Sequence, residues 1–127
     1  MTRPVRLDAA LSGLLFALLA AQVGVFIVSH SSTFDEPAVI GAGYSYVRTG
    51  RIELETKVHP PLMKYLFGLF VSIASPSFDA QSPALQHDWP YAFGYDFLFH
   101  NRVKPEGLLG LARLVSLLLS LSLSACL

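Results

Sequence analysis

The sequence predicts an all-α membrane protein with two transmembrane helices, joined by an extracytoplasmic loop that contains short interfacial helices. The first observation is composition, because the 127 residues are 53% hydrophobic and only 14% charged, which is more apolar than an ordinary soluble domain. The second is position, since the apolar residues are concentrated at the two ends of the chain. The third is charge: the formal net charge is zero and basic residues do not cluster, which excludes a nucleic-acid-binding protein.

The first apolar segment, residues 9–29, contains no charged side chain. A bilayer core of roughly 30 Å requires about 20 helical residues, so this segment is long enough to span it. Arg3 and Arg6 precede the segment, and no Lys or Arg follows it before Arg48. Because positive flanks favour the cytoplasmic side, residues 1–8 are expected to form a cytoplasmic tail. A cleaved signal peptide is the alternative, but its apolar region is only about 7–15 residues long.

The second apolar segment, residues 107–127, is predicted to form the second transmembrane helix, truncated by the end of the chain. It contains Arg113, and a charge at the centre of a bilayer costs about 2.5–3.5 kcal/mol. Arg113 lies near one end of the segment, however, where a long side chain can reach the membrane interface. Cys126, the single cysteine, has no partner for a disulfide within the chain.

Residues 30–106 form the predicted extracytoplasmic loop, which begins with an acidic pair, Asp35 and Glu36. Pro37 favours a short helix that starts just after this pair, because proline suits the first turn of a helix. Thr33 or Asp35 would cap it. The loop therefore presents two carboxylates just beyond the end of the first span.

The rest of the loop contains three further segments. Residues 51–58 alternate weakly between polar and apolar side chains after Gly50, which should end the first loop helix. Residues 62–74 predict a second helix that is too short to cross a bilayer and fits an interfacial or re-entrant position. In the last segment, residues 78–106, aromatic side chains occupy every odd-numbered position from Trp89 to Phe99, which hints at a strand. An aromatic belt at headgroup level explains the same composition and is the preferred interpretation.

Two polar clusters carry the chemistry-bearing side chains, one around Asp35 and Glu36 and the other running from His59 to Lys64. A carboxyl group near a low-dielectric boundary has a raised proton affinity, which suits a base that takes a proton from a hydroxyl. A structural interpretation competes with this one. In it Asp35 is a helix cap, Glu36 a solvated loop charge, His59 a turn residue fixed by two prolines, and Lys64 a cation that snorkels from an interfacial helix.

The string TFDEPAVIGAGYSYVRTG and the later string KVHPPLMKYL resemble the amino-terminal region of GT-C superfamily membrane glycosyltransferases. The similar members are of the protein O-mannosyltransferase and lipid A aminoarabinose transferase type. In that family an Asp-Glu pair opens the first extracytoplasmic loop, and a His-Pro-Pro-Leu segment with a following Lys comes later. Residues 95–101 and 112–114 also resemble the family, so the resemblance covers nearly the whole chain.

The resemblance implies a role for each of four residues. Asp35 matches the general base that deprotonates an acceptor hydroxyl for inverting attack on the sugar, and Glu36 matches its neighbour, which helps to position the acceptor or the base. His59 and Lys64 match positions near the phosphate of a polyprenyl-phosphate sugar donor, where a cation or hydrogen-bond donor stabilises charge on the leaving phosphate. The implied partners are this donor, membrane lipid, and a hydroxyl-bearing acceptor in a protein, a glycan or a lipid. The implied location is a membrane, with a bacterial inner membrane expected.

The sequence also departs from the family. Many relatives place an acid directly before His-Pro-Pro, where it serves a metal site, whereas this chain has Lys57 and Val58 there and Glu55 further back. No cofactor is therefore predicted, and the divalent metal of the family stays open. Family members are longer and carry many transmembrane helices, so this chain is interpreted as an amino-terminal fragment that is inactive alone. A small two-span membrane anchor or partner-binding protein, and a degenerate gene product, are the alternatives.

Overall fold

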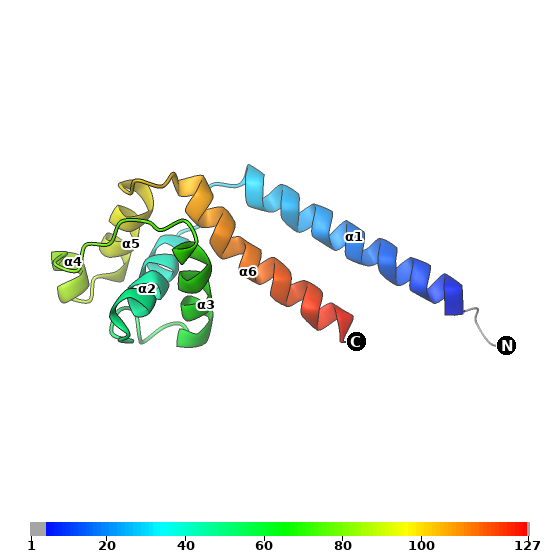
Figure 1. Cartoon of the computed structure of the whole chain (residues 1–127), viewed down its shortest axis with the longest axis horizontal. Coiled ribbons are helices and arrows are strands. Elements are labelled where there is room, and N and C mark those ends of the chain that lie inside the picture. Colours follow the sequence, from blue (N-terminus) through cyan, green and yellow to red (C-terminus); the bar gives the residue numbers. More distant parts are fainter. Residues whose placement is uncertain (1–4, 127) are drawn as a thin grey trace.

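The structure, a computed structural model, describes the backbone of residues 5–126 and the side chains of residues 9–126. Arg3 of the predicted tail and Leu127 at the end of the second predicted span lie outside the described residues. Residues 5–8, predicted as part of the tail, belong to the first helix. The described residues form six helices (Figure 1): α1 (Val5–Ser29), α2 (Glu36–Thr49), α3 (Pro61–Ser72), α4 (Pro83–Gln86), α5 (Pro90–Phe99) and α6 (Pro105–Ala125).

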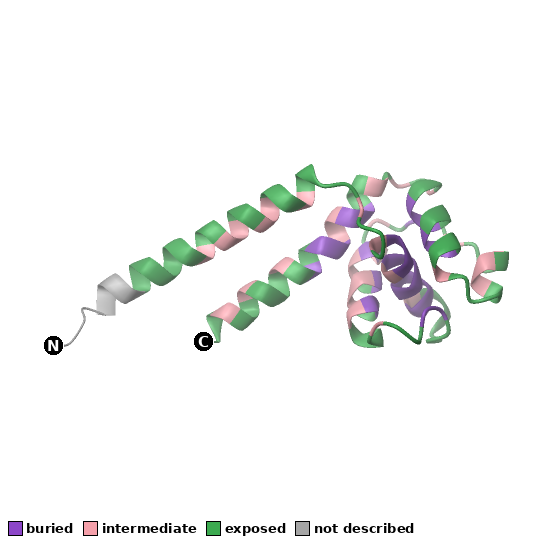
Figure 2. Ribbon diagram, turned by 180° about the vertical axis from the view of Figure 1, so that it is seen from behind, coloured by how far each residue is buried: buried purple, intermediate pink, exposed green. Residues whose placement is uncertain are grey.

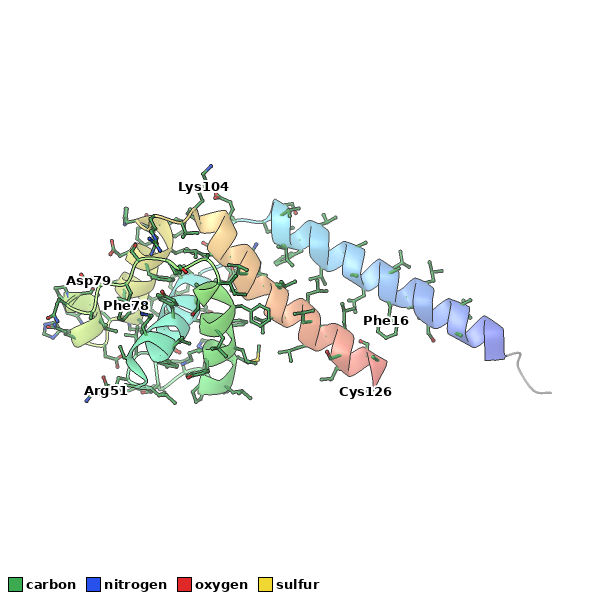
Figure 3. The ribbon with its side chains drawn as sticks, in the orientation of Figure 1. Phe16, Arg51, Phe78, Asp79, Lys104 and Cys126 are labelled. Carbon is green, nitrogen blue, oxygen red and sulfur yellow. The ribbon has the colours of Figure 1, made fainter. Side chains whose placement is uncertain are left out.

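The two longest helices, α1 and α6, form an antiparallel hairpin, and the start of α1 lies at the same end of it as the end of α6 (Figure 1). The side chain of Phe16 extends from α1 into the space between the two helices (Figure 3). Mean hydropathy is 2.3 over Ala9–Ser29 and 1.9 over Pro105–Ala125. The described chain is thus all-helical, with two helices long and apolar enough to cross a membrane, as predicted.

The core lies in a helical cluster, made of α2, α3, α4, α5 and the first half of α6, at one end of the hairpin. Figure 2 shows buried residues concentrated there, whereas none of residues 9–29 of α1 is buried. Helix α2 is central to the cluster because it packs against both α3 and α5. The buried core residues are Ile40, Ala42, Tyr44, Tyr46, Leu54, Val71, Phe93, Phe97, Leu98, Leu108, Leu109 and Ala112.

Helix α2 approaches its two neighbours closely at glycines. A Cβ atom on Gly68 of α3 would lie 2.1 Å from the carbonyl oxygen of Gly43 in α2. A Cβ atom on Gly94 of α5 would lie 2.1 Å from the carbonyl oxygen of Pro37. Because the opposing atoms belong to the backbone, neither crossing can admit a methyl group unless the helices move apart.

Substituting Gly68→Ala is therefore expected to lower the free energy of unfolding by about 1–3 kcal/mol, the usual cost of overpacking. Gly110→Ala is the matched control, because its Cβ would meet only a side-chain carbon of Ile27 at 3.9 Å and alanine gains up to about 1 kcal/mol of helix propensity. Unfolding in mixed detergent, followed by circular dichroism, measures both. Equal stabilities for the two variants would contradict the close crossing of α2 and α3.

The structure confirms the short helix after the acidic pair and overturns the strand interpretation. Helix α2 has Pro37 in its first turn and ends at Thr49, directly before Gly50, whose φ of 70° is left-handed. Residues 51–58 and 78–106 contain no strand, and the latter form α4, α5 and the start of α6. The aromatics that hinted at a strand also fit a helix: Tyr91, Tyr95 and Phe99 recur every fourth residue and lie on the exposed side of α5.

Candidate functional site

An interhelical cleft of about 250 Å³ lies beside the end of α1 and brings three of the four predicted site residues together. Asp35 and Glu36, at the start of α2, line the cleft with His59, which precedes α3. Lys64 does not line it. The lining combines polar and apolar side chains, and it consists of Thr33, Asp35, Glu36, Val39, Ile40, His59, Phe67, Ala112, Arg113 and Ser116.

Asp35 is the exposed carboxylate of the cleft. It occupies the N-cap position of α2, yet its side chain makes no capping hydrogen bond. Instead, the hydroxyl of Tyr91 in α5 donates a hydrogen bond of 3.0 Å to Asp35 Oδ1. This hydrogen bond raises the pKa of Tyr91 above its ordinary value, so Tyr91 stays a donor near neutral pH. The Asp35 carboxylate is thus held by Tyr91 and does not cap α2.

Glu36 is, in contrast, fully engaged. Arg113 Nε donates to Glu36 Oε1 at 2.7 Å and Arg113 Nη2 donates to Oε2 at 2.8 Å, which makes the ion pair bidentate. The backbone N–H of Thr33 also donates to Oε2 at 2.8 Å. Partial burial acts to raise the pKa of Glu36, but these hydrogen bonds and the guanidinium charge outweigh it and lower the pKa. A carboxylate held in this way is a poor proton acceptor, so the two acids of the pair differ chemically.

Arg113, near the start of α6, binds groups at the end of α1 and at the start of α2. Its side chain is only 7% exposed. Nη1 donates to the carbonyl oxygens of Ile27 and His30, at 3.3 and 2.8 Å, and Nη2 donates to that of Ser31 at 2.8 Å. The last carbonyls of a helix lack intrahelical partners and carry partial negative charge, which explains why a guanidinium binds there. One side chain of α6 therefore fixes the end of α1 and the start of α2.

His59 and Lys64 meet at a third carboxylate, that of Glu55. His59 Nδ1 lies 3.1 Å from Glu55 Oε1, and Lys64 Nζ forms an ion pair with the other carboxylate oxygen. The side chain of Lys64 is fully buried and that of Glu55 is 6% exposed, whereas the His59 side chain is 39% exposed. Lys64 therefore has no exposed surface with which to meet a phosphate, and it does not snorkel. Asp35, Glu36 and His59 line the cleft, whereas Lys64 is buried beside Glu55 and does not line it.

Sequence reasoning left three contributors to the site unassigned: Arg113 as the partner of Glu36, Tyr91 as the partner of Asp35, and Glu55 as the partner of His59. The spacing of Glu55, four residues before His59, was a weak signal. No local signal was available for the other two pairs, which are separated by 77 and 56 residues.

The residues do not fit a metal ion. Within the described part of the chain, no three His, Cys, Asp or Glu side chains converge. Glu36 and Glu55, the most enclosed carboxylates near the cleft, are each neutralised by a cation. A divalent ion would have to displace Arg113 or the buried Lys64, and a buried charge left without its partner is costly.

The cleft can support acid–base chemistry at a hydroxyl group. Asp35 supplies an exposed carboxylate, and His59 supplies an imidazole whose second ring nitrogen, Nε2, makes no hydrogen bond within the described residues. Glu36 and Arg113 hold the wall between α1, α2 and α6 in place. Comparison of the chain with models of known protein families, with curated proteins and with solved structures found no match.

Proposed function

We propose that this chain is the amino-terminal segment of a GT-C membrane glycosyltransferase, which transfers a sugar from a polyprenyl-phosphate donor to a hydroxyl acceptor with inversion. The observation that carries the proposal is the cleft in which Asp35 is the exposed carboxylate, Glu36 is locked by Arg113, and His59 lies on the same lining. An exposed Asp35 beside an ion-paired Glu36, with His59 on the same lining, agrees with the roles that the sequence resemblance implies for these residues.

In the proposed reaction Asp35 takes the proton of the acceptor hydroxyl as its oxygen attacks the anomeric carbon of the sugar. The new carbon–oxygen bond forms as the bond between that carbon and the donor phosphate breaks, and the phosphate leaves with the bonding electrons. Tyr91 orients the carboxylate of Asp35 by its hydrogen bond. His59, in its imidazolium form, donates a hydrogen bond from Nε2 to the leaving phosphate, where negative charge increases. Attack opposite the leaving group inverts the configuration.

The membrane setting supports this reaction. With α1 and α6 crossing a bacterial inner membrane and Arg3 on the cytoplasmic side, the cleft would face the extracytoplasmic interface, directly after the end of α1. A lipid-linked donor has its phosphate at that depth. The apolar side of the cleft suits a polyprenyl chain. Exposed Leu62 and Leu69 on α3, and Ile73 directly after it, suit contact with lipid.

The chain alone is expected to bind the donor without turning it over. The described part of the cleft is walled by α2, α3 and α6 and the segments that precede α2 and α3, whereas transfer needs a site that encloses donor and acceptor and excludes water. The remaining walls would come from further membrane helices. Sugar transfer by the purified 127-residue chain would contradict this expectation.

Donor binding tests the proposal. His59→Ala should weaken the binding of a polyprenyl monophosphate to the chain in lipid nanodiscs by roughly tenfold or more, because a charge-assisted hydrogen bond contributes about 1.5–3 kcal/mol. His87→Ala is the matched control, because His87 is exposed and does not line the cleft. Titration monitored by microscale thermophoresis measures both.

Binding that His59→Ala and His87→Ala change equally would place the phosphate elsewhere. No saturable binding to the unmodified chain would refute donor recognition by this segment. That outcome would favour the alternative, a two-span membrane anchor or partner-binding protein without catalysis.

A further inference from the structure

We infer that Glu55 is a positioning residue that sets the tautomer and orientation of His59, and that Lys64 acts on the site through Glu55 and not by touching the donor. The inference rests on the proposed function for its purpose, because His59 is there the group that meets the phosphate. Its structural content, a buried ion pair that holds one imidazole nitrogen at the edge of the cleft, can be tested separately.

The backbone around Glu55 is fixed by contacts from three helices or their ends. Its N–H donates to Asp88 Oδ1 at 3.0 Å, Lys64 Nζ donates to its carbonyl oxygen, and the hydroxyl of Tyr46 donates to the carbonyl of Leu54. Glu55 also has a φ of 55°, in the left-handed region that non-glycine residues seldom adopt. A conformation of this kind persists only where its surroundings determine it, so the position of the carboxylate is specified and not incidental.

The chemistry of the pair then fixes the tautomer of His59. With Lys64 beside it, Glu55 is an ionised carboxylate, which can only accept hydrogen bonds. The proton between Glu55 Oε1 and His59 Nδ1 must therefore lie on Nδ1. In the neutral imidazole this leaves Nε2 as the acceptor, and in the imidazolium Nε2 becomes a donor. One ring nitrogen is thus reserved for the protein and the other is left for a ligand.

A second histidine pair in the chain provides an internal comparison. His100 Nδ1 lies 3.0 Å from Asp96 Oδ1 with the same spacing of four residues, but the two side chains are 62% and 72% exposed. Water competes for an exposed pair of this kind, and such a pair contributes little. His59 is held instead by a carboxylate that is itself buried and neutralised by a fully buried lysine. Of these two pairs, the His59 pair is the one whose surroundings favour a single tautomer.

Nitrogen-15 NMR of histidine-labelled chain in detergent micelles, at a pH where imidazole is neutral, tests this directly. In the unmodified chain the His59 signals should be those of a single Nδ1–H tautomer, whereas His100 should average between tautomers. In the double variant Glu55→Leu with Lys64→Met, His59 should shift to a mixture of tautomers. The double substitution is chosen because it removes both charges together and leaves no buried charge unpaired. Asp96→Leu, the control, should leave His59 unchanged.

Two results would overturn the inference: an Nε2–H tautomer of His59 in the unmodified chain, or an unchanged His59 signal in a folded double variant. The first needs no substitution, so a variant that fails to fold leaves the test intact. Binding of a polyprenyl monophosphate to the same samples separates this inference from the proposed function. We expect the double variant to lose only part of the affinity that His59→Ala loses, because the ring keeps Nε2 but loses the carboxylate that orients it. A single Nδ1–H tautomer without any phosphate binding would refute the proposed function and leave the positioning role standing.

Discussion

Asp35→Asn is expected to lower the rate of sugar transfer about 10²- to 10⁴-fold, which is the usual contribution of a general base. Asparagine has nearly the same shape and can still accept the hydrogen bond from Tyr91, but it cannot take a proton from the acceptor. The loss should therefore fall on kcat, with little change in the apparent affinity for the donor. Transfer from a labelled polyprenyl-phosphate sugar, in native membranes that contain the protein with its usual partners, measures it.

Asp79→Asn is the matched control for this experiment. Asp79 lies on the side of the helical cluster away from the two long helices (Figure 3). Within the described residues its carboxylate accepts a hydrogen bond only from the backbone N–H of Gln81. It should keep unmodified activity. An Asp35→Asn protein that retains half of the activity or more would remove Asp35 from the role of base.

Arg113→Met is expected to cost about 3–5 kcal/mol of folding free energy, because it leaves Glu36 partly buried without its cation and frees the carbonyls at the end of α1. The double variant with Glu36→Gln should recover part of this loss, since it removes the unpaired charge. Arg51→Met is the control: its ion pair with Glu53 is exposed on both sides and should contribute less than about 1 kcal/mol. Mixed-detergent unfolding followed by circular dichroism measures all three.

The same variants should differ in their response to acid. The pKa of Glu36 is lowered by folding from an ordinary value of 4.5, so the ion pair stabilises the protein fully above that value. This stability is lost as the pH falls through the lower folded-state pKa, because protonation of Glu36 breaks the pair. We expect the unmodified chain to lose more stability than Arg113→Met between neutral pH and acid. Parallel pH profiles for the two proteins would show that Arg113 does not stabilise the ionised form.

Local sequence signals predicted the elements of this fold well. Proline at the start of a helix and glycine just after its end are local signals, and they predicted that α2 starts near Pro37 and is stopped by Gly50. Length and hydropathy similarly predicted α1 and α6. The aromatic segment was ambiguous, because residues four positions apart, such as Tyr91 and Tyr95, lie on the same face of a strand and also on the same face of a helix.

The site was only partly predictable, because its chemistry depends on which helices pack together. The sequence placed Asp35, Glu36 and His59 near a common boundary, and the cleft contains all three. That Glu36 is locked while Asp35 is exposed follows from the position of Arg113 in α6, and helix packing, not local pattern, brings this residue to the start of α2. The burial of Lys64 likewise depends on the loop around Glu55.

Photo-crosslinking with a polyprenyl phosphate that carries a diazirine on its lipid chain tests the central claim most directly. The chain in nanodiscs is irradiated with the probe, and the labelled residues are identified by mass spectrometry. Labels are predicted in the cleft, at Val39, Phe67 or Ser116, and excess unlabelled polyprenyl phosphate should abolish them. Labels confined to the apolar groove between α1 and α6, where Phe16 lies, would contradict a donor site at the acidic pair.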